Sequence, residues 1–158
     1  MFHSKVWGEG CDYNIVRAMG LDVGTRRIGI AISDVTRTLA RPLMTIEVAN
    51  PANVVEGVER VAREVSKLAD EDDSLSTIVV GLPVRLDGSA NAQTSRVKDF
   101  IARLKERTTI EVVTADERLT SVEAESRIAE RVKDWRERKK KLDAAAAAII
   151  LQDYLDRA

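Results

Sequence analysis

The spacing of apolar residues changes several times along the chain, and each change predicts a structural element. Ile28, Ile30 and Ile32 alternate with small residues, and this period of two is typical of a strand with one bulky face. The segment 15–22 before them predicts another strand, and Gly24 permits a tight turn between the two. This part of the pattern therefore predicts a buried β-hairpin.

Further along, short apolar segments alternate with amphipathic ones. Segment 39–48 predicts a third strand, and Pro42 favours an edge position because proline cannot donate a ladder hydrogen bond. Between residues 53 and 68, apolar side chains recur every three or four positions, which predicts a helix. The same reasoning predicts strands at 75–82 and 109–114, and helices around 97–104, 120–132 and 142–155. Trp135 extends the apolar stripe of the helix that begins near residue 120, so we expect it in the core.

The order of these elements indicates the fold class. Residues 1–14 have little periodicity and predict an irregular extension, whereas 15–158 predict a single domain. Three strands on short connections predict an antiparallel meander, and the later strand–helix alternation predicts right-handed parallel crossovers. We therefore expect an α/β protein with helices on the faces of a mixed sheet. This order resembles a ribonuclease H-like fold, in which a mixed five-stranded sheet has the order 3-2-1-4-5 and is flanked by helices.

Composition restricts the available chemistry. The 158 residues carry a formal net charge of −1, with one histidine, His3, and one cysteine, Cys11. An intramolecular disulfide is impossible, a Cys/His zinc site is implausible, and histidine catalysis would rest on a residue near the terminus. Carboxylates, hydroxyls, basic side chains or a metal held by oxygen remain. No apolar run is long enough for a signal peptide or a membrane span, so we expect a cytoplasmic protein with no membrane partner.

Three carboxylates fall where predicted elements end or begin. Asp22 ends the first strand, Glu117 follows the last strand, and Asp143 lies at the start of the final helix. Mg²⁺ and Mn²⁺ prefer oxygen ligands, and two such ions about 3.5–4 Å apart can activate water and stabilise the leaving oxygen of a phosphodiester. We therefore predict a two-metal site in which these three acids are ligands and catalytic residues. Asp87, shortly after the fourth strand, is an alternative to Glu117.

The alanine run 144–148 follows Asp143 directly. Small side chains would let the helix backbone lie close to the sheet and bring Asp143 within reach of the other acids. Alanine is also the best helix former, and this explains the run without any role in a site. Both interpretations stay open on the sequence alone.

Basic residues concentrate in segment 131–141, where seven positive and two negative side chains give a local charge of +5. Such a segment would attract nucleic-acid phosphates with strong salt dependence, although a solvated helix end can have the same composition. The predicted hairpin turn adds two arginines. The candidates for nucleic-acid contacts are Arg26, Arg27, Arg118, Arg138, Lys139, Lys140 and Lys141.

Four ordered blocks, from about residue 17 to the C-terminus, resemble the YqgF/RuvX family. They are Gly20-Leu21-Asp22-Val23-Gly24 with Ser33-Asp34, Val79-Val80-Gly81-Leu82-Pro83 with Asp87-Gly88-Ser89, Asp116-Glu117-Arg118-Leu119-Thr120-Ser121, and Lys141-Leu142-Asp143 with Ala146-Ala147 and Ile150-Leu151-Gln152. The resemblance implies a ribonuclease H-like fold related to the RuvC Holliday-junction resolvase, and a nuclease that helps to mature the 5′ end of pre-16S rRNA. It also implies that Asp22, Glu117 and Asp143 occupy the family's acidic positions.

The leading hypothesis is a metal-dependent endonuclease that processes pre-16S rRNA in ribosome biogenesis, with RNA, in the context of the ribosome, as its partner. One alternative is a Holliday-junction resolvase acting on branched DNA, which would need a symmetric dimer to cut two strands. The chain could therefore act as a monomer or a homodimer. Another alternative is a nucleic-acid-binding module without catalysis, which the presence of all the candidate acids disfavours. Residues 22–25 also resemble a phosphate loop of actin-like ATPases, but those enzymes need two such halves.

Overall fold

The computed structural model describes residues 16–72, 75–85, 87–116, 122–141 and 144–158, and in these ranges five strands form one mixed sheet. The elements are β1 (Arg17–Val23), β2 (Arg27–Ser33), β3 (Ala40–Glu47), α1 (Val54–Asp72), β4 (Leu75–Leu82), α2 (Ala92–Arg107), β5 (Glu111–Asp116), α3 (Val122–Arg131), α4 (Trp135–Lys141) and α5 (Ala144–Arg157). The strand order is β3-β2-β1-β4-β5. β2 is antiparallel to β1 and β3, and β4 is parallel to β1 and β5. The predicted sheet order and the edge position of the third strand are confirmed.

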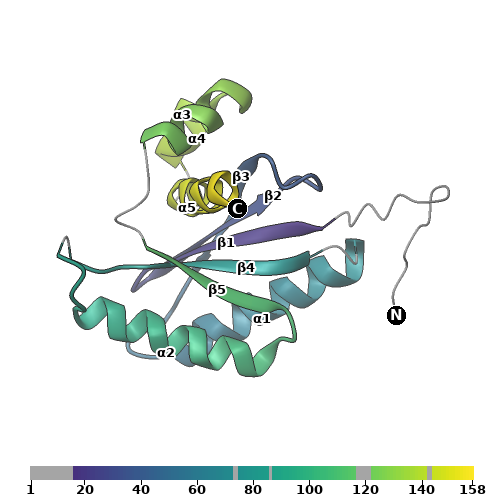
Figure 1. Ribbon diagram of the computed structural model, residues 1–158. Helices are drawn as coiled ribbons and strands as arrows, with labels where there is room; N and C mark the ends of the chain where they lie inside the picture. Colours follow the sequence, from purple (N-terminus) through teal and green to yellow (C-terminus); the bar gives the residue numbers. More distant parts are fainter. Residues whose placement is uncertain (1–15, 73–74, 86, 117–121, 142–143) are drawn as a thin grey trace.

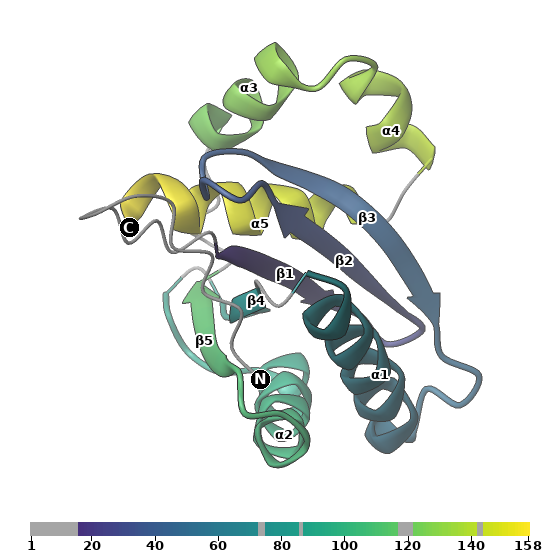
Figure 2. The same ribbon diagram turned by 90° about the vertical axis from the view of Figure 1, so that its right-hand side faces the viewer.

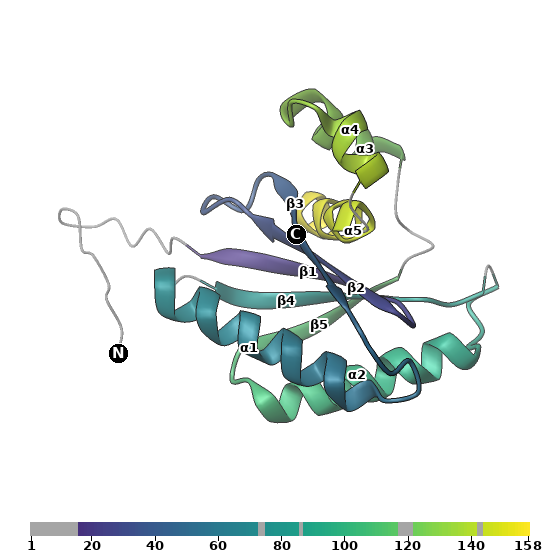
Figure 3. The same ribbon diagram turned by 180° about the vertical axis from the view of Figure 1, so that it is seen from behind.

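Helices cover both faces of the sheet. α1 and α2 pack on one face, α5 packs on the other, and α3 and α4 lie on the outer side of α5 (Figure 1, and from behind in Figure 3). The periodic apolar residues explain the first of these layers, because Val58 and Val65 of α1 and Phe100 and Leu104 of α2 are buried in one core. A second core lies beneath α5 and includes its alanines. Burial of these two apolar surfaces is the main force that holds the layers together.

Close backbone packing explains the alanine run at the start of α5. A Cβ atom built on Gly20 of β1 would lie 2.8 Å from the carbonyl oxygen of Ala147 and 2.7 Å from Cβ of Leu151. Ala144, Ala147 and Leu151 are all fully buried against the sheet. The close packing in the first interpretation is therefore confirmed, since the small side chains let the α5 backbone touch β1. That the run brings Asp143 to the other acids stays a prediction, because Asp143 lies outside the described residues.

The segment between β5 and α5 differs from the sequence prediction. The apolar spacing predicts one helix with a stripe that reaches Trp135, whereas α3 ends at Arg131 and α4 begins at Trp135. Asp134 between them has a φ of 67°, in the left-handed region that interrupts a helix. Trp135 is nevertheless only 5% exposed. The core role of Trp135 is confirmed, and the continuous helix is wrong.

Asp34 organises the turn between β2 and β3. Its carboxylate accepts hydrogen bonds from the Thr36 hydroxyl at 2.6 Å, the Thr38 amide at 2.8 Å and the Leu39 amide at 3.1 Å. Partial burial raises the pKa of Asp34, but these hydrogen bonds outweigh it and hold the pKa below its ordinary value. The charged form of Asp34 therefore stabilises this turn.

Replacing Asp34 with asparagine is expected to destabilise the protein in a pH-dependent way. Because the folded-state pKa of Asp34 is lowered from 3.8, its contribution is present above about pH 4 and is lost as the pH falls through the folded-state pKa. Asp34→Asn should lower the free energy of unfolding by about 1 kcal/mol at neutral pH, and this loss should vanish in strong acid. Urea unfolding at both pH values measures the difference. Asp99→Asn is the control, since Asp99 forms an exposed ion pair with Arg103, and an equal loss at both pH values would contradict the prediction.

Candidate functional site

The structure describes some of the predicted site residues and not others. Asp22 lies in β1, Arg26 lies in the turn after β1, Arg27 is the first residue of β2, and Asp87 lies in the loop after β4. Arg138 and Lys139 lie on α4 and are exposed. Outside the described residues or side chains are Glu117, Arg118, Lys140, Lys141 and Asp143.

Asp22 lies at the edge of the sheet where the parallel strands end. β1, β4 and β5 run side by side, with Leu21 level with Val80, and Val80 level with Thr114. The carboxyl ends of these strands therefore meet at one edge, where ligands of open α/β sheets usually bind. Leu21 and Val23 both point into the core beneath α1 and α2. Because side chains alternate along a strand, Asp22 points to the opposite face, which α5 covers.

Asp116 does not share the face of Asp22. Val112 of β5 lies in the core beneath α1 and α2, whereas Ala115 packs against the core beneath α5. Strand alternation therefore turns Asp116 toward the face that α1 and α2 cover. Asp116 is at the correct edge of the sheet but on the wrong face to meet Asp22.

The N-terminus of α5 points toward the Asp22 end of β1. Ala147 and Leu151 lie over Gly20, whereas Gln152 accepts a hydrogen bond from the Ala40 amide and donates one to the Thr38 carbonyl, both at 2.9 Å. These last contacts are near the start of β3, beside the start of β1. α5 therefore runs antiparallel to β1, as Figure 2 also shows, and its first turn lies toward Asp22.

The first turn of α2 fixes the same edge of the sheet. The Gln93 side chain donates to the carbonyl of Val23 at 3.0 Å, directly after Asp22. The Thr94 hydroxyl donates to the carbonyl of Pro83, after β4, and also closes a capping box with Asn91. Arg96 donates to the carbonyl of Thr25 at 3.3 Å. The ends of β1 and β4 are thus held together by the first turn of α2.

Two side chains at this edge were missed by the sequence analysis. Thr45 of β3 pairs with Gly29, and Gly29 pairs with Asp22, so Thr45 lies on the Asp22 face. Arg96 joins Arg26 and Arg27 near the hairpin turn. Neither could be found from the sequence, because a lone threonine in a strand and a lone arginine in a helix carry no motif.

Asp87 belongs to a tight exposed loop. Its carboxylate accepts a hydrogen bond from the Ser89 amide at 2.8 Å, and Gly88 has a φ of 90° that favours glycine. The loop is closed by Arg85 and Ser89 at 2.9 Å. Asp87 therefore has a structural role in its own turn, and its role as a substitute ligand stays a prediction.

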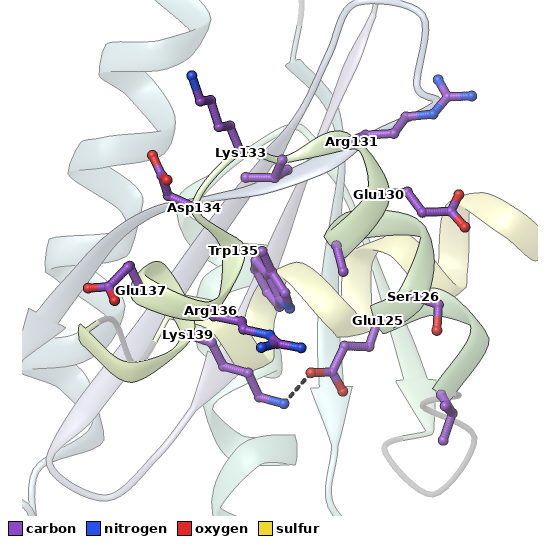
Figure 4. A pocket seen from close by; sticks show the side chains of 13 residues that line it. Glu125, Ser126, Glu130, Arg131, Lys133, Asp134, Trp135, Arg136, Glu137 and Lys139 are labelled. Atoms are coloured by element: carbon purple, nitrogen blue, oxygen red, sulfur yellow. Dashed lines mark hydrogen bonds and ion pairs between the residues drawn. The ribbon is translucent and has the colours of Figure 1, made fainter.

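The outer layer contains a separate groove of about 930 Å³ between α3 and α4. The Trp135 ring lies between the two helices, and Lys139 pairs with Glu125 across it (Figure 4). Acidic and basic side chains line this groove in equal numbers, namely Glu125, Glu130, Asp134 and Glu137 against Arg131, Lys133, Arg136 and Lys139. The groove lies on the outer side of α5, away from the sheet, so it is distinct from the sheet edge that carries Asp22.

The donors at the Asp22 edge are of the type that binds a hard cation. Asp22 offers carboxylate oxygens, and on the same face, among the described residues, the buried Thr45 hydroxyl has no hydrogen-bond partner. In the part of the chain that the structure describes, no three His, Cys, Asp or Glu side chains gather closely enough to hold a metal ion. Glu117 and Asp143 lie outside that part. The oxygen chemistry therefore fits Mg²⁺ or Mn²⁺, which prefer oxygen ligands.

Residues 16–157 match the model of the RuvX family, described as Holliday junction resolvase. The chain belongs to the RuvX family. A protein of Thermoanaerobacter pseudethanolicus is 38% identical over 142 residues, which cover 89% of this chain and 96% of the relative. A protein of Caldanaerobacter subterraneus subsp. tengcongensis is 41% identical over 142 residues, with the same coverage of 89% and 96%. Both relatives are named "Putative pre-16S rRNA nuclease".

Solved structures support the fold assignment of this RuvX-family chain. Thermus thermophilus RuvC in complex with a Holliday junction substrate aligns with a TM-score of 0.56 and 14% identity, covering 90% of this chain and 94% of the RuvC chain. At this identity the likeness concerns the fold alone, and it confirms the predicted ribonuclease H-like fold. Within the described ranges, no helix is both long enough and apolar enough to cross a membrane.

Proposed function

We propose that this RuvX-family protein is a cytoplasmic, metal-dependent endonuclease that hydrolyses phosphodiester bonds of pre-16S rRNA. The observation that carries the proposal is the position of Asp22, a carboxylate at the common edge of three parallel strands and on the face covered by α5. Relatives that match nine-tenths of the chain carry the name of such a nuclease. The names of the relatives and the position of the Asp22 carboxylate therefore support the same activity.

We propose Glu117 as the second ligand, in preference to Asp116 or Asp87. Ala115 lies on the Asp22 face and Asp116 on the other, so continued alternation would return the next residue to the Asp22 face. Asp87 accepts a hydrogen bond within its own loop. These observations favour Glu117, because Asp116 could reach the Asp22 face only if the alternation of side chains along β5 were broken.

We propose Asp143 as the third ligand, and the geometry of α5 supports it. Ala147 lies against Gly20, and position 143 is four residues earlier, about 6 Å along a helix axis. Asp22 is two residues beyond Gly20, about 6.6 Å along the strand in the same direction. The two distances match, so a helix that approaches β1 this closely would bring Asp143 over Asp22.

The protein's own residues would divide the work of the reaction. A bound Mg²⁺ or Mn²⁺ pair would supply Lewis-acid activation of the attacking water and stabilise the leaving oxygen. Asp22, Glu117 and Asp143 would hold the cations. Gln93 fixes the backbone after Asp22, and so keeps the carboxylate in position. The N-terminal end of α5 would add a positive dipole near the scissile phosphate.

Basic residues near this edge would hold the substrate backbone. Arg26 and Arg27 at the hairpin turn are exposed beside Asp22, and α4 leads into the N-terminus of α5. Arg138 and Lys139 on α4 are exposed too. Lys139 pairs with Glu125, but an exposed ion pair is worth only about 0–1 kcal/mol and can be exchanged for a phosphate. We propose that these residues, with Arg118, Lys140 and Lys141, contact the nucleic acid.

Removing three of these charges is expected to weaken substrate binding and flatten its salt dependence. The Lys139→Ala, Lys140→Ala, Lys141→Ala protein should lose about one unit of slope in log affinity against log salt for each phosphate contact removed. Filter binding at several salt concentrations measures this slope. The matched control replaces Lys67, Lys98 and Lys105, exposed lysines of α1 and α2 on the opposite face. Equal slopes in both triple variants would contradict the proposed interface.

The deciding experiment compares two substrates under matched conditions. Labelled RNA that spans the 5′ leader of 16S rRNA and a four-way DNA junction are each incubated with Mg²⁺, Mn²⁺ or EDTA. Metal-dependent cutting of the RNA alone would establish the proposed function. Intact RNA in the presence of either ion, and also with ribosomal particles added, would overturn it.

A second candidate is a junction resolvase, favoured by the description of the matching family as Holliday junction resolvase. This reading requires two copies of the site, because a resolvase cuts two strands related by symmetry. Cutting of the four-way junction by a dimer, with the RNA left intact, would select it. Sedimentation of the free protein would separate a monomer from a homodimer.

A further inference from the structure

In the part of the chain that the structure describes, Thr45 has a buried hydroxyl without a hydrogen-bond partner. An unpaired buried polar group costs about 1–3 kcal/mol, and each one in a native structure calls for an explanation. Other buried hydroxyls of the described residues are paired, since Ser33 accepts from the Ala18 amide at 2.8 Å and Thr94 donates to the Pro83 carbonyl. Among the described residues, Thr45 is therefore the one with a buried hydroxyl that stays unpaired, and a partner from outside the fold would satisfy it.

The sheet register places this hydroxyl opposite Asp22. Asp22 of β1 pairs with Gly29 of β2, and Gly29 pairs with Thr45 of β3. Met44 and Ile46 beside Thr45 pack into the core beneath α1 and α2, so Thr45 points to the α5 face, as Asp22 does. Three residues on neighbouring strands thus form a row across one face.

The middle position of this row is a glycine. Gly29 has no side chain, so β2 places no side chain between Asp22 and Thr45. Two strand spacings separate their backbones by about 9.6 Å, too far for a direct hydrogen bond. A carboxylate, a cation, its water and a hydroxyl together span about 7 Å, which is within this backbone separation.

We propose that Thr45 is a positioning residue of the metal site, and that its hydroxyl hydrogen-bonds a water ligand of the divalent cation held by Asp22. The inference rests on the proposed function, because it needs a cation at Asp22. Thr45 does not touch the cation itself. It would act from β3, two strands away from Asp22, by orienting the water ligand, as hydrogen-bonding partners of metal ligands do in other sites.

Thr45→Val tests the assignment, because valine keeps the shape of threonine and removes the hydroxyl. In the metal-free protein, loss of an unpaired buried hydroxyl should leave the midpoint of thermal unfolding unchanged or raise it. The rise of that midpoint with added Mg²⁺ should shrink. With substrate, kcat should fall about tenfold with little change in KM, and Thr45→Ser should restore most of it.

The controls separate this inference from the proposed function. Thr114→Val makes the same change at an exposed position of the other edge strand, on the opposite face, and should alter none of these values. If wild-type protein cuts neither substrate, the proposed function fails and the Mg²⁺ titration alone decides Thr45. The assignment is then supported if added Mg²⁺ raises the unfolding midpoint less in Thr45→Val than in Thr114→Val. The assignment would be overturned if Mg²⁺ raised the midpoint equally in both variants, or if the midpoint of metal-free Thr45→Val were lower than that of the wild type.

Discussion

Asp22→Asn protein is expected to remain folded and to bind nucleic acid, while its metal-dependent cleavage falls by at least about a thousandfold. Asparagine has the shape of aspartate but carries no charge and presents a single oxygen, so it is a poor ligand for a hard cation. Asp22 lies where three parallel strands reach their carboxyl ends, on the face of the sheet that α5 covers. The substitution therefore removes the central ligand of the proposed site and leaves the surrounding packing in place.

The measurement is single-turnover cleavage of labelled substrate, together with thermal unfolding in EDTA and with Mg²⁺. Asp99→Asn is the control, since Asp99 is an exposed carboxylate of α2 that pairs only with Arg103 among the ion pairs described here. It should cleave as wild type does. Loss of the Mg²⁺-dependent rise in unfolding midpoint should accompany the loss of cleavage in Asp22→Asn. Wild-type cleavage by the Asp22→Asn protein would eliminate the proposed mechanism.

Most of the architecture could be predicted because the apolar period is a local property of the chain. The strand at 75–82 was predicted at the same bounds that β4 has, and α1 continues the predicted helix by a few residues. The first and last strands are displaced by about two residues because strand ends depend on pairing partners, which are remote in sequence. Pro42 predicted the edge strand correctly, since its ring removes a ladder donor.

The division between α3 and α4 could not be predicted, for a different reason. Asp134 adopts a φ of 67°, but residues 131–135 contain neither glycine nor proline to indicate a break. The helix ends there because Trp135 is buried at the start of α4, in the core beneath α5. Tertiary packing overrides local propensity at this point.

The site was only partly accessible from sequence. Asp22 could be placed because it lies at the end of an apolar strand beside a glycine turn, and the structure puts it one residue before the end of β1. Its role as a ligand stays a proposal. Its alignment with Thr45 depends on two pairings and on the register shift between Ile30 and Ala31. A register shift of one residue would reverse the face of Thr45. Such long-range geometry leaves no mark in a single sequence.

Gly20→Val is expected to cause the largest loss of stability of any change considered, about 3 kcal/mol or more. The added Cβ would meet the Ala147 carbonyl oxygen at 2.8 Å and Leu151 Cβ at 2.7 Å. Neither atom can rotate away, because one belongs to the α5 backbone and the other is bonded to it. The whole helix must therefore move off the sheet, and the core beneath it loses contact.

Gly20→Ala separates the effect on stability from the effect on the site. It should cost about 1–3 kcal/mol, which leaves the protein folded at low temperature. A shift of α5 by about 1 Å would misplace the proposed ligand Asp143, and a misplacement of that size can reduce a rate about a hundredfold. Cleavage by the folded Gly20→Ala protein should therefore fall much more than its folded fraction does.

Gly57→Ala is the matched control for this pair of substitutions. Its added Cβ would lie 2.9 Å from Cδ1 of Ile28, nearly the same distance, but that atom is the free end of a side chain that can change rotamer. Gly57 also lies inside α1, where alanine is favoured over glycine by about 1 kcal/mol. Urea unfolding should therefore find Gly57→Ala close to wild type in stability, and cleavage should be unchanged. If the two glycines gave equal losses, contact between α5 and β1 would not be what positions this helix over Asp22.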